Sequence, residues 1–440
     1  MTGTTSTAPA KRSYSHWWLW LIPIIFLLVA SNIKWSGTQW QALIATDAKG
    51  YYDYFPALFI YQDLQFDFFD DFKSSDYYAE HKFQDYRRVV PGGTINKYFA
   101  GVALAQLPFT LVAHILAEPL GYPADGYSKP YQIAVSLAGI VYACLGLWFI
   151  WLLLGQFEVA PIRRNWVVAL LAFGTHLFVY AIPEPGMSHA YSLAFMAIFF
   201  FAVLRYQKEG IPLALLVAGL AFGMILLIRP VNGLSILAIP FLLGSWQNVI
   251  LLWQRMWTRP AWLVLCLLLG LSLSFLQLLT YHAQTGSWVH YSYPGERFDF
   301  SKPAFWSILF SYRKGLFLYT PILLVSLAGF YYFHAFRRWS GLAFLVILTY
   351  VFSSWSNWWY GGSFSSRPYV EYLPIFGLGL GVLLEQTAGR WRAGILTAFV
   401  VLGLVCQIQI YQYRYYQIHY SEMTKERYWD VFLRLDQLVK

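Results

Sequence analysis

The chain has 440 residues, of which 58% are hydrophobic and only 12% are charged, against about 25% charged residues in an average soluble protein. This composition excludes an ordinary soluble enzyme and predicts an all-α polytopic membrane protein. The formal net charge of +9 does not indicate a nucleic-acid partner, because short cytoplasmic loops of membrane proteins carry an excess of Lys and Arg. The 20 Trp and 33 Tyr residues exceed what interfacial belts require, and they suggest an aromatic-rich cavity as well.

The first apolar run, 16–33, follows Lys11 and Arg12 and has no small-residue cleavage signature. It is predicted to be a retained signal anchor. We expect residues 1–15 to be a disordered cytoplasmic N-terminus and 34–129 to be a long extracytoplasmic loop. The three cysteines lie inside apolar runs, and their spacing shows neither a disulfide framework nor a zinc site.

Ten further apolar runs can cross a bilayer by their length. They cover 130–154, 166–183, 188–205, 211–228, 233–252, 261–281, 315–334, 340–354, 368–386 and 393–412. A further apolar segment, 98–117, is ambiguous from length alone. With 16–33, the prediction is about 11 transmembrane helices in a domain that spans 16–412, followed by an extracytoplasmic tail at 413–440.

Charge decides how the segment 98–117 is interpreted. If this segment does not cross and the N-terminus is cytoplasmic, a series of short basic linkers faces the cytoplasm, as the positive-inside rule requires. The linkers hold Arg163 and Arg164, Arg205 and Lys208, Arg255 and Arg259, Arg337 and Arg338, and Arg390 and Arg392. If the segment crosses, all of these residues lie outside. We therefore expect 98–117 to be an interfacial helix on the outer side.

The first loop carries the candidate catalytic acid, Asp47, with Asp53 as a reserve candidate. A carboxylate close to the outer end of a span can lie over a cavity and act as a general base. The alternative for Asp47 is that it caps the helix that follows. A later acidic cluster favours a solvated loop over a metal site, and it consists of Asp63, Asp67, Asp70, Asp71 and Asp76.

Positive charges at the outer ends of spans are not explained by the positive-inside rule. Cations at the outer mouth of a bundle can bind an anionic group, although snorkelling to lipid headgroups is the alternative. The candidates for binding a donor phosphate are Lys97, Arg229, Arg313, Lys314 and Arg367. Lys97 starts a predicted helix, where the helix dipole also favours anions.

Further candidates for substrate binding lie in short outer connections and aromatic loops. Glu184 and His189 flank a tight hairpin, where His189 has a purely structural role as its alternative. Glu296 lies in the loop 282–314, and loops of this length are usually functional or disordered. Aromatic faces suit contact with a sugar, although an interfacial belt explains them equally well. The aromatic candidates are Tyr51, Tyr98 and Trp359.

This layout resembles the GT-C superfamily of membrane glycosyltransferases, which includes protein O-mannosyltransferases and the aminoarabinose transferases of lipid A. The resemblance rests on one span, a long first loop with the early Asp47, interfacial helices and a bundle of spans, over nearly the whole chain. Lys97-Tyr98 resembles the basic-aromatic turn that family members have before an interfacial helix. The stretches that look typical of the bacterial branch are Ser188-His189, Arg229-Pro230, Arg313–Phe317 and Gly361–Arg367.

Three features depart from that pattern. Asp47 is followed by Ala48 where the mannosyltransferases have a pair of acids, which is why Asp53 stays in reserve. The turn before the interfacial helix reads Lys97-Tyr98-Phe99 instead of a His-Pro-Pro or Lys-Pro-Pro motif. We also see no large soluble C-terminal domain. The sugar and the acceptor therefore stay open.

The resemblance implies an inverting transferase that takes a sugar from a polyprenyl phosphate, with Asp47 as general base. A lipid, a glycan or a protein would be the acceptor, at the extracytoplasmic face of a multi-pass protein in a bacterial inner or plasma membrane. No cofactor is required for this chemistry, a bound divalent metal is compatible with it, and no nucleic acid takes part. The rival hypotheses are an oligosaccharide ligase or polymerase, and a lipid or solute transporter.

Overall fold

The computed structural model describes residues 20–33, 35–73, 85–434 and 436. The expected disordered segment 1–15, which includes Lys11 and Arg12, lies outside the described residues, as does Asp76 of the acidic cluster. The structure is 70% helical, and in the described part of the chain its sheet is one two-stranded hairpin. The protein is an all-α polytopic membrane protein.

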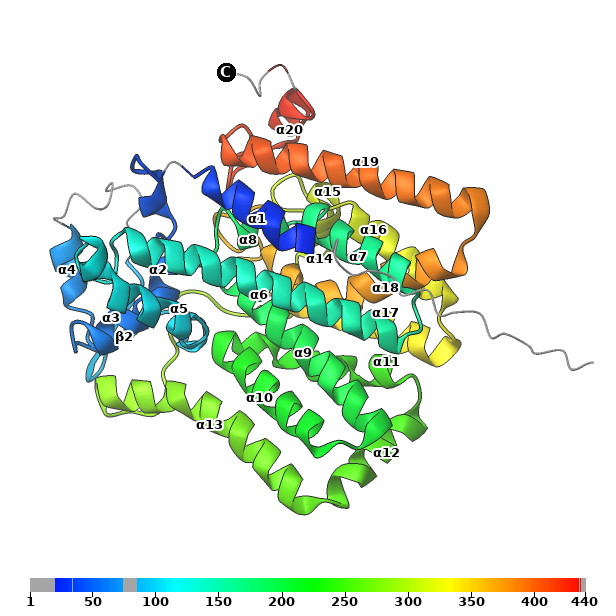
Figure 1. Ribbon diagram of the computed structural model, residues 1–440, viewed down its shortest axis with the longest axis horizontal. Coiled ribbons are helices and arrows are strands. Elements are labelled where there is room, and N and C mark those ends of the chain that lie inside the picture. Colours follow the sequence, from blue (N-terminus) through cyan, green and yellow to red (C-terminus); the bar gives the residue numbers. More distant parts are fainter. Residues whose placement is uncertain (1–19, 34, 74–84, 435, 437–440) are drawn as a thin grey trace, which may run out of the picture.

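Long helices run side by side through the bundle, and the elements of the first loop gather at one end of it (Figure 1). The bundle helices are α1 (Leu21–Ser31), α6 (Lys129–Gln156), α7 (Pro161–Phe173), α9 (Ser188–Glu209), α10 (Pro212–Ile228), α13 (Pro260–Thr285), α17 (Ala335–Ser353), α18 (Leu373–Gln386) and α19 (Gly389–Arg414). The first loop folds into η2 (Gln39–Ala42), α2 (Asp47–Tyr52), α3 (Tyr54–Phe59), α4 (Phe68–Lys73), β1 (Arg87–Val90), β2 (Gly93–Asn96), α5 (Gly101–Ala117) and η4 (Glu118–Leu120).

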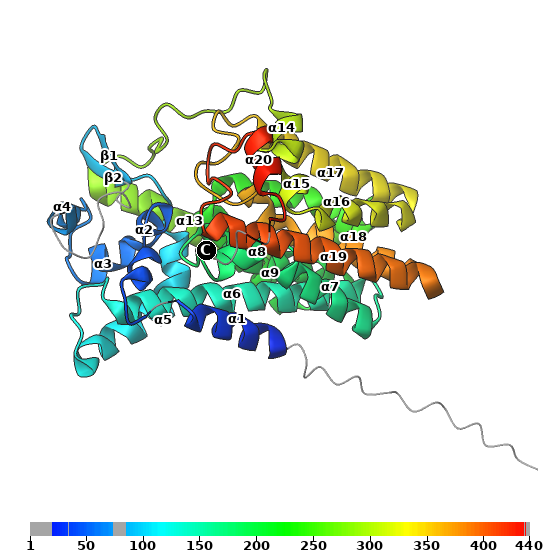
Figure 2. The same ribbon diagram turned by 90° about the horizontal axis from the view of Figure 1, so that it is seen from above.

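Shorter elements connect the long helices and form the rim of the bundle. They are α8 (Leu177–Ala181), η5 (Pro230–Ala238), α11 (Ile239–Leu243), α12 (Trp246–Trp257), α14 (Phe305–Phe310), α15 (Leu316–Tyr319), α16 (Ile322–Ser326), η6 (Leu327–Tyr332), η7 (Arg367–Tyr372) and α20 (Lys425–Val431). The C-terminal α20 packs back toward α14 and α15 (Figure 2), where Tyr428 contacts the rings of Tyr312 and Tyr319.

By length and hydropathy, six helices within the described residues can each cross a membrane. Five of them coincide with predicted spans, and the sixth is Gly101–Leu120, which the charge argument assigns to the interface. The other predicted spans correspond to shorter or broken helices. The assignment of α5 to the membrane interface stays a prediction, because its length and composition are also compatible with a crossing helix.

The predicted span 233–252 needs a correction. The chain bends by 117° between Pro230–Leu243 and Trp246–Trp257, at Gly244, whose φ is +78°. Arg337 explains why the first segment ends there, since its guanidinium donates to the carbonyls of Phe241 and Leu242 at 3.0 and 3.1 Å. A Cβ on Gly244 would approach that guanidinium to 2.5 Å. The apolar segment is therefore 230–243, and α12 turns away from it.

The basic linkers of the sequence meet at the bundle end opposite the first loop. Several of their side chains donate to backbone carbonyls at helix ends. Arg255 donates to Tyr206 and Gln207, and Arg259 donates to Gly210 at 3.1 Å. Charge-assisted hydrogen bonds of this kind stabilise helix C-termini. These cations therefore have a structural role in addition to the topological one that the sequence suggests.

The opposite end of the bundle is organised by the β1–β2 hairpin. Its two-residue turn is Pro91-Gly92, with Gly92 at φ +95°, as a turn with Pro first and Gly second requires. A Cβ on Gly92 would lie 2.3 Å from the carbonyl oxygen of Thr285. Gln65 joins the hairpin to α13 through bonds of 2.7 Å to Thr94 N and Gln284 O. The hairpin thereby fixes the first loop against the bundle.

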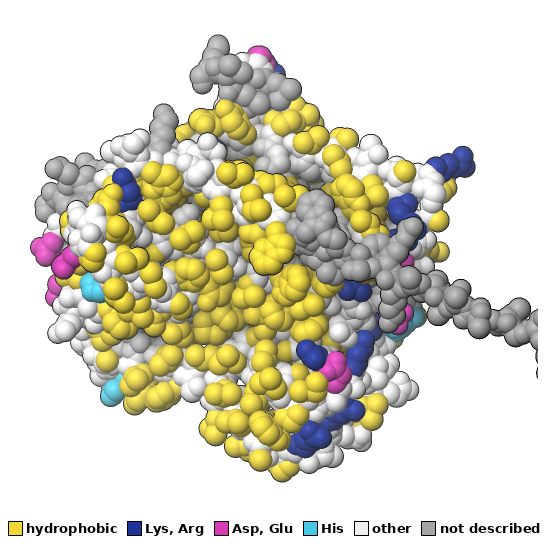
Figure 3. Space-filling view, viewed as in Figure 1, with side chains coloured by type: hydrophobic (Ala, Val, Ile, Leu, Met, Phe, Trp, Pro, Cys, Tyr) yellow, Lys and Arg dark blue, Asp and Glu magenta, His cyan; other side chains and the backbone are white. Residues whose placement is uncertain are grey.

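The surface seen in Figure 3 is mostly apolar across the middle of the molecule, and most Lys and Arg side chains on this face lie toward the end opposite the first loop. Exposed Leu, Val, Phe and Trp side chains along α13 contribute to the apolar surface of the bundle. A wide apolar surface of this kind fits a protein surrounded by lipid.

Candidate active site

A cavity of about 1220 Å³ opens between the first loop and the rim of the bundle. Its walls come from the start of α2, the turn before α5, the α8–α9 hairpin, the α10–η5 corner, the loops 290–298 and 355–367, and the end of α19. The charged or ionisable residues that line it include Asp47, Arg88, Lys97, Glu184, His189, Arg229, His290, Glu296, Arg367 and Arg414. Segments that are far apart in the sequence thus share one polar cavity.

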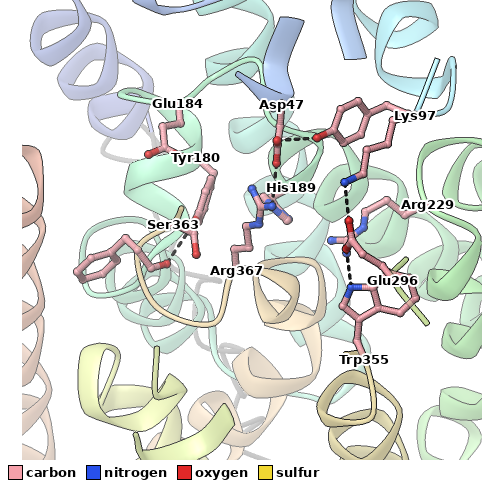
Figure 4. A network of polar contacts seen from close by, with 12 residues as sticks. Asp47, Lys97, Tyr180, Glu184, His189, Arg229, Glu296, Trp355, Ser363 and Arg367 are labelled. Atoms are coloured by element: carbon pink, nitrogen blue, oxygen red, sulfur yellow. Dashed lines mark hydrogen bonds and ion pairs between the residues drawn. The ribbon is translucent and has the colours of Figure 1, made fainter. Parts of the chain in front are cut away.

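Asp47 lies at the centre of the polar network drawn in Figure 4. Its Oδ1 accepts a hydrogen bond of 2.6 Å from the Tyr98 hydroxyl, and its Oδ2 accepts one of 2.8 Å from Arg367 Nη2. Burial raises the pKa of this carboxyl, but Arg367 and Tyr98 outweigh that effect, so the pKa lies below its ordinary value. Asp47 is therefore ionised at neutral pH and held in one orientation.

The backbone around this carboxylate is strained. Thr46, directly before Asp47, has φ +53°, a region that β-branched residues rarely adopt. Tyr360 and Ser365, in the loop that carries Arg367, have φ of +54° and +57°. Strained backbone of this kind costs about 1–3 kcal/mol per residue and is found preferentially at functional sites. Asp47 and Arg367, which form an ion pair, thus both follow residues with strained backbone.

One side of the cavity is rich in ion pairs. Lys97 Nζ lies 2.7 Å from Glu296 Oε1, and Trp355 Nε1 donates to the other oxygen of Glu296 at 3.2 Å. Arg229 Nη1 lies 2.8 Å from Glu371 Oε1. The candidate phosphate-binding side chains Lys97 and Arg229 therefore line the cavity, and each is balanced by a carboxylate.

Glu371 is a functional candidate that the sequence analysis missed. It is fully buried in η7 and accepts hydrogen bonds from His189 Nδ1 at 3.0 Å, from Arg229 and from Asn232. His189 itself lines the cavity and packs edge-on against Tyr180. The sequence did contain a signal, because an acid within an apolar run predicted to cross the membrane marks a functional position.

The other side of the cavity is built by the α8–α9 hairpin and the C-terminal part of the chain. Glu184 accepts a hydrogen bond of 2.9 Å from the Tyr413 hydroxyl, and burial raises the pKa of this carboxyl above its ordinary value. Tyr416 and Tyr420 add aromatic faces to this wall. The sequence analysis assigned no role to these C-terminal tyrosines, because no motif marks them.

The aromatic candidates Tyr51 and Tyr98 both line the cavity, with ring centroids 4.5 Å apart. A Cβ on Gly50 would approach the Tyr98 ring to 2.3 Å, so this glycine lets Tyr98 reach Asp47. Tyr293, also in the lining, packs edge-on against Tyr98. The carboxylate is therefore backed by aromatic rings.

Asp53 lies outside the cavity lining. It is fully buried, with Lys49 Nζ at 3.0 Å and hydrogen bonds from the hydroxyls of Tyr86 and Tyr127. Burial raises the pKa of Asp53 and lowers that of Lys49, although their attraction opposes both shifts. The structure therefore separates this reserve candidate from the cavity.

Three other candidates also lie outside the lining. Arg313 stacks on Trp359, with its guanidinium carbon 3.8 Å from the ring centroid, and donates to Ser421 O at 2.7 Å. Lys314 is buried and donates to the carbonyls of Ser363 and Tyr420. These residues hold the loop 361–367 and the C-terminal segment in place. In this geometry none of them is positioned as a ligand for a substrate phosphate.

Among the described residues, no group of three or more His, Cys, Asp and Glu side chains has the arrangement of a metal site. The acidic cluster is split in the structure. Asp63 accepts hydrogen bonds from the backbone of Gln65, Asp67 and Phe68, and Asp70 pairs with Arg87 at 2.9 Å. The described members of this cluster thus have local structural roles.

Comparison with known structures supports the fold. The crystal structure of ArnT from Cupriavidus metallidurans in the apo state superposes with a TM-score of 0.50 at 13% sequence identity. The match covers 89% of this chain and 64% of that one, so this chain spans less than two thirds of the length of ArnT. ArnT is a GT-C aminoarabinose transferase. This chain has a GT-C-like fold.

At this identity the likeness establishes the fold and leaves substrates open. No protein-family model matches the sequence, and no curated protein matches it either. The expected resemblance to the GT-C superfamily is thus confirmed for the fold. The chemistry of the site has to be argued from its own residues.

Proposed function

We propose that this protein is a membrane glycosyltransferase that moves a sugar from a polyprenyl phosphate to an acceptor hydroxyl, with inversion at the anomeric carbon. The observation that supports this most strongly is the position of Asp47. It is an ionised carboxylate in the wall of a large cavity, oriented by Arg367 and Tyr98, with further cations nearby. General-base catalysis needs a carboxylate oxygen within hydrogen-bond reach of the nucleophile.

In the proposed step, the acceptor oxygen attacks the anomeric carbon from the face opposite the phosphate. The bond between this carbon and the phosphate oxygen breaks, and its electron pair leaves with the polyprenyl phosphate. The hydroxyl proton passes to Asp47. The products are one glycosidic bond and one polyprenyl phosphate, and this balance needs no oxidant or reductant.

Lys97 and Arg229 supply positive charge for the leaving phosphate. Charge that develops in the transition state is stabilised best by cations that are already oriented. The two cations now face the carboxylates of Glu296 and Glu371. Glu296 belongs to an irregular loop, whereas Glu371 is fully buried. Lys97 is therefore the cation that exchanges its partner for a phosphate most readily.

The sidedness of this reaction follows from the basic end of the bundle. The basic linkers meet at the end opposite the cavity, so the positive-inside rule assigns the cavity to the extracytoplasmic face. A polyprenyl-phosphate donor is delivered within the membrane, and the apolar surface of the bundle provides room for its lipid chain. Lipids, glycans and proteins all carry suitable acceptor hydroxyls.

The test uses the full-length protein in proteoliposomes that also contain native membrane extract as a source of acceptor. A panel of radiolabelled polyprenyl-phosphate sugars is added, and label is followed from the donor to the acceptor. We expect one donor to be consumed, with the opposite anomeric configuration in the product. Label that only crosses the bilayer without a new glycosidic bond would instead identify a transporter. Transfer of preassembled oligosaccharides alone would identify a ligase.

A further inference from the structure

Two residues that line the cavity have a buried polar atom with no hydrogen-bond partner among the described residues, namely His189 Nε2 and Arg367 Nη1. Both residues line the cavity, and Figure 4 shows them at the centre of the polar network. Leaving a buried donor or acceptor unpaired costs about 1–3 kcal/mol. Such atoms in a cavity wall are therefore suited to receive a ligand group.

The tautomer of His189 follows from its other ring nitrogen. Nδ1 lies 3.0 Å from Glu371 Oε1, an oxygen that also accepts a hydrogen bond of 2.8 Å from Arg229. A carboxylate that accepts from an arginine requires a donor at Nδ1, so Nδ1 carries the ring proton. In the neutral imidazole with this tautomer, Nε2 carries a lone pair that has no partner among the described residues.

Arg367 contributes a hydrogen-bond donor. Its Nη2 donates to Asp47 Oδ2 at 2.8 Å, which fixes the plane of the guanidinium. Nη1 then points in a direction set by that plane and still has hydrogens to donate. The cavity wall thus offers one acceptor, His189 Nε2, and one donor, Arg367 Nη1. A hydroxyl group both donates and accepts, and it is the common sugar substituent that satisfies both atoms.

We propose that His189 and Arg367 form a subsite for one hydroxyl group of the transferred sugar, which donates to His189 Nε2 and accepts from Arg367 Nη1. Glu371 is a positioning residue in this subsite, because it fixes the tautomer of His189. A phosphate or carboxylate oxygen does not fit, since it would face the lone pair of Nε2. An ammonium group does not fit either, because Arg367 would repel it. This inference rests on the proposed function for the identity of the substrate as a sugar donor.

The structure offers a matched control for His189. His176 is also fully buried, its Nδ1 lies 3.2 Å from Thr320 Oγ1, and its Nε2 has no partner. In contrast to His189, it does not line the cavity. An unpaired imidazole nitrogen alone is thus not sufficient for a subsite, and the same substitution at both positions separates recognition from packing.

The experiment measures equilibrium binding of polyprenyl-phosphate sugars, of their single-deoxy analogues and of polyprenyl phosphate without sugar, to the full-length protein in nanodiscs. Removal of the recognised hydroxyl should weaken binding to the wild type by about 10-fold to 100-fold. In His189→Asn the amide nitrogen can replace Nδ1 toward Glu371 while the acceptor at Nε2 is lost. This variant should bind the parent sugar and that deoxy analogue equally within about 3-fold, and it should bind polyprenyl phosphate as the wild type does.

His176→Asn should discriminate between the parent sugar and its analogue as the wild type does. The subsite would be overturned if His189→Asn kept the full discrimination, or if the wild type bound every deoxy analogue as tightly as the parent. Glu371→Gln provides a second variant, in which the reversed tautomer should also reduce the discrimination. Because binding is measured without turnover, a sugar that binds through this subsite but is never transferred would overturn the proposed function and leave the subsite intact.

Discussion

Asp47 and Asp53 begin and follow the same short helix, α2, yet they occupy opposite environments. Asp47 lines the cavity and is held by Arg367, a residue from the far end of the sequence. Asp53 is buried among Lys49, Tyr86 and Tyr127, which all belong to the first loop. Burial raises the pKa of Asp53, whereas Arg367 and Tyr98 lower that of Asp47 against the effect of burial. Similar sequence position therefore does not imply a similar role.

The largest expected effect comes from Asp47→Asn. The amide keeps the shape of the side chain but cannot accept the proton, and loss of a positioned general base costs about 10²-fold to 10⁴-fold in rate. Stability should fall by less than in Asp53→Asn, because the Asp47–Arg367 ion pair borders a cavity. Donor consumption and thermal unfolding of the purified variant check both statements. A variant that transfers sugar at more than a tenth of the wild-type rate contradicts the assignment of the base.

Asp53→Asn should show the reverse pattern, with a large loss of stability. The substitution removes the carboxylate 3.0 Å from Lys49 Nζ in a buried environment, and breaking a buried ion pair costs about 3–5 kcal/mol. Chemical denaturation measures this loss. The double variant Lys49→Met/Asp53→Asn removes both charges and should recover at least half of the lost stability. Failure of the double variant to recover would show that the tyrosine hydrogen bonds dominate this network.

Arg367→Lys tests how Asp47 is oriented. Lys keeps the positive charge but lacks the planar fork that places Nη2 on Asp47 and Nη1 in the cavity wall. Since a hydrogen bond to a charged group contributes about 1.5–3 kcal/mol, we expect transfer to fall by about 10-fold to 100-fold. The ratio of kcat values is the measurement. A change confined to KM would indicate that Arg367 binds the donor without orienting the base.

The pH dependence of stability provides a further contrast. The pKa of Asp47 in the folded state lies below its ordinary value, which is about 3.9 in an unfolded chain. The stabilisation from this group is therefore fully present above about pH 5 and is lost as the pH falls through the folded-state pKa. The difference in unfolding temperature between wild type and Asp47→Asn should stay constant from pH 7 to about pH 5 and shrink below that. A difference that already shrinks near pH 6 would contradict the lowered pKa.

The smallest effect is expected for Trp359→Leu. Trp359 stacks on Arg313 outside the cavity, and a half-buried cation–π contact contributes about 0.5–2 kcal/mol. Transfer should stay within about 3-fold of the wild type, with a slight loss of stability. Tyr51→Leu is the matched comparison, because Tyr51 lines the cavity. Equal activity losses in both variants would show that the lining does not define the substrate site.

The structure places Asp47 in the cavity lining, while its catalytic role stays a prediction. The sequence was sufficient for the fold class, because hydropathy and the order of span and loop are local properties of the chain. The sequence was not sufficient to distinguish the outer cations that line the cavity from those that do not. Arg313 and Lys314 are neighbours of the lining loops, yet their side chains turn to Trp359 and to backbone carbonyls. Whether a cation faces a cavity depends on packing between distant segments, and no spacing rule encodes it.

Glu371 shows the opposite kind of failure. Its signal, an acid in the apolar run 368–386, was present in the sequence, but the run was interpreted only as a span. The structure places the acid in the 3₁₀ segment η7, where it accepts hydrogen bonds from His189 and Arg229, which both line the cavity. The bend at Gly244 was also invisible to hydropathy, because the two segments that it separates are together apolar enough for one span.

The central claim is that the reaction depends on Asp47 and not on Asp53. The most direct measurement compares donor consumption by wild type, Asp47→Asn and Lys49→Met/Asp53→Asn at equal amounts of folded protein in proteoliposomes. The account predicts that the wild type and the double variant transfer sugar, whereas Asp47→Asn, although folded, does not. Activity in Asp47→Asn, together with an inactive but folded double variant, would contradict it.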